Sequence, residues 1–76
     1  MNYPDRQTVE NIRKQYPVGT RVVLLKMDAP YTKIPLGTLG TVICVDDIGS
    51  IRVQWDTGSC LNIIYGEDEC RIISTP

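Results

Sequence analysis

Histidine is absent from this sequence of 76 residues, and its three cysteines lack the C-x-x-C spacing of common metal sites. A tetrahedral zinc site normally takes four Cys or His ligands, so Cys44, Cys60 and Cys70 are too few to form one. Free cysteine often behaves as a small apolar side chain. We therefore expect three reduced thiols, with one disulfide and one free thiol as the alternative, and we predict no metal and no cofactor.

Long hydrophobic runs are also missing. No apolar stretch approaches the roughly 18 residues that a membrane-spanning helix needs. The first residues, MNYPD, show no basic region followed by an apolar run, which is the pattern of a secretory signal. Together with reduced cysteines, these features predict a cytoplasmic protein that makes no membrane contact.

The sequence has no run of basic residues and no large excess of either charge. Eight Lys and Arg residues stand against nine Asp and Glu residues, for a net charge of −1. The basic residues are scattered, whereas acidic residues gather at 46–47 and 67–69. Nucleic-acid modules usually present a basic face. This balance favours a protein partner and keeps nucleic acid as the alternative.

One helix is expected, over residues 5–16. Asp5 is a suitable N-cap, and Val9, Ile12 and Tyr16 form one narrow apolar stripe at helical spacing. Pro17 disfavours helical geometry at the preceding residue and ends the helix. A helix this short needs tertiary contacts to be stable, so we expect it to lie across one end of the rest of the fold.

From residue 19 onward the pattern is that of short strands and turns. Strand 50–55 alternates cleanly, with Ile51, Val53 and Trp55 on the inward face. A long loop at 26–37, tight turns near 46–49 and 56–58, and a 3₁₀ turn before the last strand complete the order. The expected strands cover residues 20–25, 39–45, 50–55, 59–64 and 70–73. This order predicts a single, mainly β domain over 1–76, with the helix at 5–16 and a five-stranded SH3-like barrel at 19–74.

The segment VQWDTGS, at residues 53–59, resembles the Asp-Thr-Gly-Ser segment of aspartic proteases. That chemistry requires two carboxylates that share a proton, so a single copy would have to dimerise. The same residues also make a preferred hairpin turn after a strand. We therefore predict no catalytic residues and no enzyme, and keep a dimeric aspartic-type hydrolase at Asp56 as a third alternative.

A candidate binding groove follows from the expected barrel, in which the first long loop faces the segment before the 3₁₀ turn. Aromatic residues on such loops bind extended peptides or stacked bases. The alternative is that Tyr31 and Tyr65 close the ends of the barrel. The predicted binding residues are Met27, Asp28, Tyr31, Tyr65, Glu67 and Asp68.

Six ordered segments are distinctive as a set: YPVGTRV at 16–22, MDAPY at 27–31, GTLGTV at 37–42, VDD at 45–47, VQWDTG at 53–58 and YGED at 65–68. Together they resemble the domain of unknown function 4314 (DUF4314) family from about residue 16 to the C-terminus. The resemblance implies a small bacterial SH3-like protein, often encoded near phage or conjugative mobile elements, without an assigned activity. We expect a non-enzymatic protein-binding module, monomeric or weakly dimeric.

Overall fold

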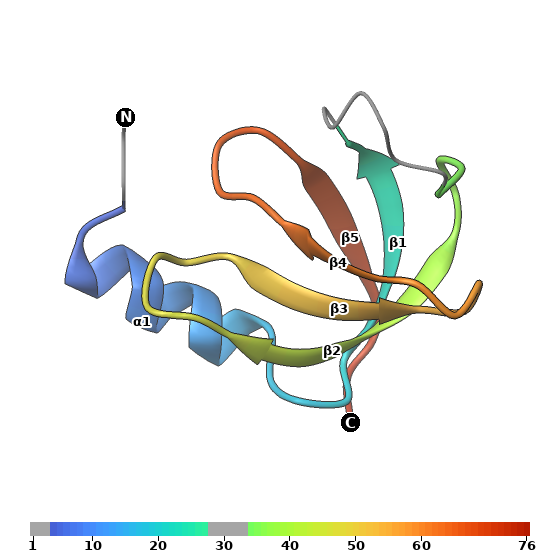
Figure 1. Cartoon of the computed structure of the whole chain (residues 1–76). Helices are drawn as coiled ribbons and strands as arrows, with labels where there is room; N and C mark the ends of the chain where they lie inside the picture. Colours follow the sequence, from blue (N-terminus) through green and yellow to red (C-terminus); the bar gives the residue numbers. More distant parts are fainter. Residues whose placement is uncertain (1–3, 28–33) are drawn as a thin grey trace.

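A computed structural model of the chain describes residues 4–27 and 34–76. Its elements in chain order are α1 (Arg6–Gln15), β1 (Arg21–Lys26), β2 (Leu39–Val45), β3 (Ile51–Trp55), β4 (Cys60–Ile63) and β5 (Glu69–Ser74). All neighbouring strands are antiparallel, and they form one sheet in the order β4-β3-β2-β1-β5 (Figure 1). The predicted mainly β fold, with five strands and one N-terminal helix, is confirmed.

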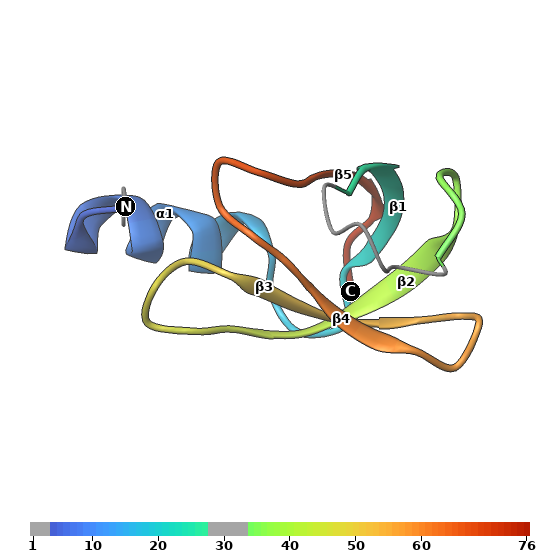
Figure 2. The same cartoon turned by 45° about the horizontal axis from the view of Figure 1, so that its top comes forward.

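The sheet curls but stays open. Figure 2 shows β1 and β5 rising from the layer that β2, β3 and β4 form. Register shifts in the β1–β5 and β2–β3 ladders assist this curvature, because a bulge increases local twist. Within the described ranges no ladder joins β4 to β5, the two ends of the strand order. The predicted closure into a barrel is therefore not observed.

The β4–β5 connection contains a tight turn where the sequence predicted a short 3₁₀ turn. The N–H groups of Glu67 and Asp68 both donate to the Ile64 carbonyl oxygen, each at 3.0 Å. One of these bonds spans three residues and the other spans four. Residues 65–67 thus form a single hydrogen-bonded turn that does not continue as a 3₁₀ helix.

Trp55 occupies the concave side of the sheet and is only 1% exposed. Its indole Nε1–H donates to the Leu61 carbonyl oxygen at 3.1 Å, which satisfies its one polar group. Gly40 pairs with Trp55 across the β2–β3 ladder. A Cβ atom at Gly40 would lie 2.7 Å from Trp55 Cε3, so the close contact requires glycine here. The buried core comprises Val22, Leu24, Ile34, Val42, Val45, Ile51, Val53, Trp55 and Ile63.

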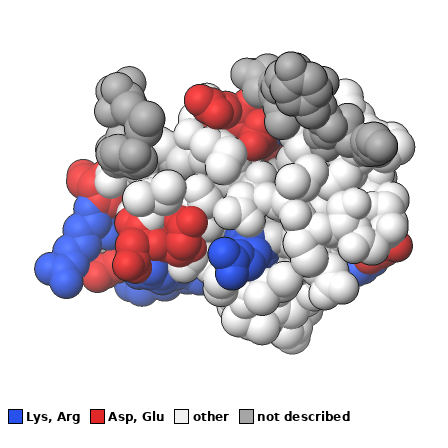
Figure 3. All heavy atoms as spheres, in the orientation of Figure 1, with Lys and Arg blue, Asp and Glu red and all other residues white. Residues whose placement is uncertain are grey.

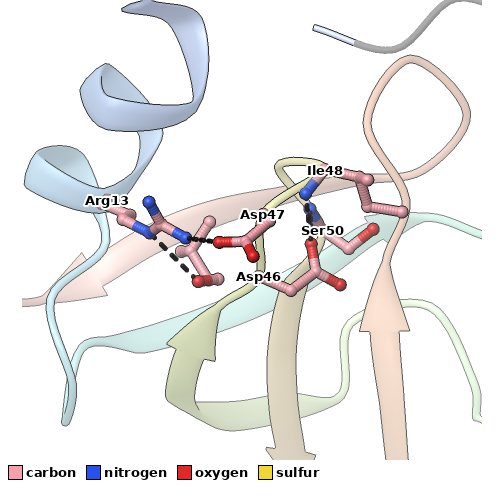
Figure 4. A network of polar contacts seen from close by, with 6 residues as sticks. Arg13, Asp46, Asp47, Ile48 and Ser50 are labelled. Carbon is pink, nitrogen blue, oxygen red and sulfur yellow. Dashed lines mark hydrogen bonds and ion pairs between the residues drawn. The ribbon is translucent and has the colours of Figure 1, made fainter. Parts of the chain in front are cut away.

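Helix α1 packs against the turn between β2 and β3. Asp5 caps the helix by accepting a hydrogen bond from the Thr8 N–H at 2.8 Å, and Val9 is buried. Arg13 Nε donates to the Val45 carbonyl oxygen at 3.2 Å, and its Nη2 donates to Asp47 Oδ1 at 2.7 Å (Figure 4). The helix therefore lies at one end of the sheet, as the sequence predicted. Across residues 4–27 and 34–76, no helix has the length and apolar character to cross a membrane.

The turn that receives α1 is itself held by Asp46. Its Oδ1 accepts hydrogen bonds from the N–H groups of Ile48 at 3.1 Å and Ser50 at 2.9 Å (Figure 4). An Asp side chain that bonds nearby backbone in this way replaces the missing ladder bonds of a turn. Asp46 and Asp47 thus have structural roles: one shapes the turn and the other meets the helix.

Candidate functional site

A cavity of about 240 Å³ lies where the C-terminal end of α1, the β2–β3 turn, the β4–β5 turn and the start of β5 meet. Its apolar walls include Ile12 of α1 and the pair Ile51 and Ile63, which face each other across the β3–β4 ladder. Tyr16 is the C-cap residue of α1, four positions after Ile12, and its side chain also lines the cavity. Three segments distant in sequence therefore build one apolar site.

Cys70 and Tyr16 meet in the wall of this cavity. Burial raises the pKa of the Cys70 thiol to about 11, and the neighbouring Tyr16 side chain partly opposes that rise. Burial, together with the nearby Cys70, also raises the pKa of Tyr16. Both groups stay protonated at neutral pH. Because the thiolate is the reactive form of cysteine, Cys70 is a neutral wall residue and is not poised as a nucleophile.

The mouth of the cavity is aromatic and acidic. Tyr65 is 45% exposed and lines the cavity, together with Asp68 and Glu69. Asp68 Oδ2 accepts a hydrogen bond from the Ile64 N–H at 2.9 Å, which braces the turn. Figure 3 shows acidic side chains gathered over the β2–β3 and β4–β5 turns. An apolar interior therefore opens at a rim that carries negative charge.

Two of the predicted binding residues, Tyr65 and Asp68, line this cavity. Glu67 is exposed in the turn between them. Met27 is half-buried against the core and does not line the cavity. The predictions for Asp28 and Tyr31 lie outside the described residues.

The site therefore includes the helix, which the predicted groove did not. Ile12, Tyr16 and Cys70 were absent from the prediction. The spacing of Ile12 and Tyr16 marked a buried helix face, but it did not indicate that this face borders a cavity. Nothing local distinguishes Cys70 from the other cysteines; all three are free, and Cys60 is exposed. Among the described residues, no three Cys, Asp or Glu side chains gather as metal ligands.

Asp56, the residue of the hydrolase alternative, forms a bidentate pair with Arg21. Arg21 Nη1 donates to Asp56 Oδ1 at 2.8 Å, and Nη2 donates to Oδ2 at 2.6 Å. Arg21 Nη1 also donates to Thr41 Oγ1 at 2.8 Å. Hydrogen bonds from the guanidinium lower the pKa of Asp56, so its carboxylate stays ionised. An aspartic-type hydrolase needs a carboxyl that shares a proton with a second carboxyl. The pairing of Asp56 with Arg21 therefore gives the hydrolase alternative no support.

These observations define a class of small protein in which one helix packs against an open, curled antiparallel sheet. The family model described as "Domain of unknown function (DUF4314)" matches residues 5–73, nearly the whole chain. The chain belongs to this family, as its ordered segments indicated. No curated protein and no solved structure matches it.

Proposed function

We propose that this protein is a binding module that accepts one side chain of a partner protein in the cavity between α1 and the β4–β5 turn. The observation that carries the proposal is the apolar cavity of about 240 Å³ with an aromatic and acidic mouth. Sites for small-molecule ligands and cofactors usually enclose about 300–1,000 Å³. A smaller volume suits a single anchoring side chain.

Tyr65 is the residue best placed to contribute affinity. It stands at the mouth with nearly half of its surface exposed, and a bound segment would cover that surface. Aromatic residues at the centre of an interface often dominate binding, because they bury a large area with little loss of side-chain freedom. Burying the apolar part of one partner side chain contributes about 1.5–3 kcal/mol. A micromolar complex requires about 8 kcal/mol, so contacts of the partner around the mouth must supply the remainder.

The charge at the mouth favours protein over nucleic acid as the partner. Asp68 and Glu69 line the cavity, and Glu67 lies in the same turn. Phosphate groups approaching this rim would be repelled, whereas nucleic-acid affinity depends largely on neutralising phosphates. We propose that the interaction takes place in the cytoplasm, as the sequence predicts, and in a bacterial cell, as the family resemblance implies.

A peptide library displayed on phage and selected on the intact protein tests the proposal. The affinity of a selected peptide is then measured by fluorescence polarisation for wild type, Tyr65→Ala and Ile73→Ala. We expect Tyr65→Ala to weaken binding by about fivefold or more, because it removes the aromatic wall. Ile73 is a matched control: it is 52% exposed on β5 and does not line the cavity.

The proposal is contradicted if wild type selects no peptide, or if Tyr65→Ala and Ile73→Ala change the affinity equally. Circular dichroism of both variants establishes that they keep the wild-type fold. Tyr65→Phe separates the two parts of the side chain. It retains affinity if the ring carries the contact, as proposed.

A further inference from the structure

We propose that the side chain bound in this cavity is cationic, and that arginine is its preferred form. This inference rests on the proposed function and adds the chemical identity of the anchor. It combines the charge of the rim, the shape of the cavity and the ion pairs that acidic residues form at two other turns of the sheet.

Two other turns of the sheet already pair a carboxylate with a guanidinium. At the β2–β3 turn, Asp47 pairs with Arg13 at 2.7 Å. Directly after β3, Asp56 pairs with Arg21 at 2.6 Å. Directly after the β4–β5 turn, Glu69 is the first residue of β5, and within residues 4–27 and 34–76 it forms no ion pair. A guanidinium supplied by a partner would complete the same arrangement at the third turn.

The charges around the cavity also favour a cationic side chain. Among the residues that the structure describes, the charged side chains that line it are Asp68 and Glu69, both acidic. Lys26 stands opposite Glu69 in the β1–β5 register but is exposed and does not line the cavity. Tyr16 and Cys70 remain neutral, so none of the described lining residues carries a positive charge that would oppose an entering cation. The rim is therefore complementary to positive charge.

The shape of the cavity suits a long basic side chain. Arg and Lys bury their aliphatic stems against apolar surface and keep the charged group in water. Here Ile12, Ile51 and Ile63 supply the apolar walls, and the carboxylates lie at the mouth. Tyr65 adds an aromatic surface, on which a guanidinium stacks better than an ammonium does. Arginine satisfies all three features at once.

Three small probes test this inference on the isotope-labelled full chain by NMR titration. n-Butylguanidinium represents the arginine side chain, n-butylammonium represents lysine, and N-butylurea is an uncharged analogue of the same shape. We expect n-butylguanidinium to shift the amide signals of Tyr16, Gly66 and Cys70, which line the cavity. N-butylurea should bind at least about fivefold more weakly, because it lacks the charge that the rim attracts.

Charge-neutralising variants locate the effect. We expect Glu69→Gln to weaken n-butylguanidinium binding by about three- to tenfold and to leave N-butylurea unchanged. The control is Glu10→Gln, an exposed position on α1 outside the cavity lining, which should change neither probe by more than about twofold because the charge removed there is screened.

The inference is overturned if the urea and guanidinium probes bind equally, if Glu69→Gln has no effect, or if the shifted signals lie away from the cavity. Tighter binding of n-butylammonium would overturn the preference for arginine. These outcomes are distinct from failure of the proposed function. A peptide that binds through Tyr65 without a basic residue would leave the binding module intact and remove only the cationic anchor.

Discussion

Replacing Gly40 with alanine should destabilise the protein by about 2 kcal/mol, because the new methyl group enters a filled core. The added Cβ would lie 2.6 Å from Val53 Cγ1 and 2.7 Å from Trp55 Cε3. Carbon atoms in contact normally lie about 3.5–4.0 Å apart, so the neighbours would have to retreat by about 1 Å. Val53 and Trp55 are both fully buried, and Trp55 is also held by its bond to Leu61.

Two opposing terms set that magnitude. Overpacking a tight core costs about 1–3 kcal/mol, and a clash with two fully buried side chains belongs at the upper end of that range. Alanine in place of glycine regains about 0.5–1 kcal/mol of chain entropy, which leaves a net loss of about 2 kcal/mol. A domain of this size has a stability of about 3–5 kcal/mol, so a net loss near 2 kcal/mol is a large fraction of the total. The thermal midpoint should fall by about 8–16 °C.

Urea denaturation followed by tryptophan fluorescence measures the change, because Trp55 is the one tryptophan of the chain and lies at the site. Gly58→Ala is the matched control. Gly58 has a positive φ of 96°, and no atom of the described residues lies within 4 Å of an added Cβ, so Gly58→Ala should cost only the backbone strain, about 1 kcal/mol. Equal stability of Gly40→Ala and wild type would refute the packing argument.

Three further perturbations address the helix and the titrating groups. Asp5→Ala should lower the free energy of unfolding by about 1 kcal/mol through loss of the N-cap, measured by urea denaturation; no change would contradict the capping role. The pKa of Cys70 is raised from 9.0 to about 11, so its stabilising contribution is complete below pH 9 and is lost as the pH rises toward 11. In a pH series of urea denaturation, Cys70→Ala should flatten that alkaline decline of the midpoint. In a separate test, iodoacetamide at pH 8 should alkylate the exposed Cys60 before Cys70, which mass spectrometry measures. The pKa of Asp56 is lowered from 3.8, so its pair with Arg21 stabilises the fold above that pH and is lost in more acidic solution; Asp56→Asn should remove this acid dependence.

The elements themselves could be read from the sequence because their signals are local. In β3, the alternation of Ile51, Val53 and Trp55 predicted the inward face, and all three are buried. Asp5 and Pro17 bracketed the helix, which spans Arg6–Gln15. Capping, proline geometry and period-two alternation each act within a few residues, so they are visible in any short window of sequence.

Strand β2 shows where local reasoning stops. Regular period-two alternation would place Val42 and Val45 on opposite faces of the strand, yet both are buried. A register shift between Val42 and Cys44 reverses the inward phase along the strand. Gly40 leaves the space that the Trp55 ring occupies, which a Cβ atom would not. Both features depend on what the neighbouring strand places opposite, and a single strand does not contain that information.

The candidate site divides in the same way. Tyr65 and Asp68 could be selected from the sequence, because aromatic and acidic residues in a turn before the last strand suggest a surface. The cavity needs Tyr16 and Cys70 as well, which come from opposite ends of the chain and meet only after α1 docks on the sheet.

The sequence by itself determined the helix, the five strands and the family, since composition, spacing and caps act locally or as an ordered set. Only the tertiary structure decided that the sheet stays open and that a cavity lies beside the helix. It also decided that Asp56 is held by Arg21. Each of these features depends on the curvature of the whole sheet or on contacts between segments that are distant in sequence. Such contacts form only when the chain folds.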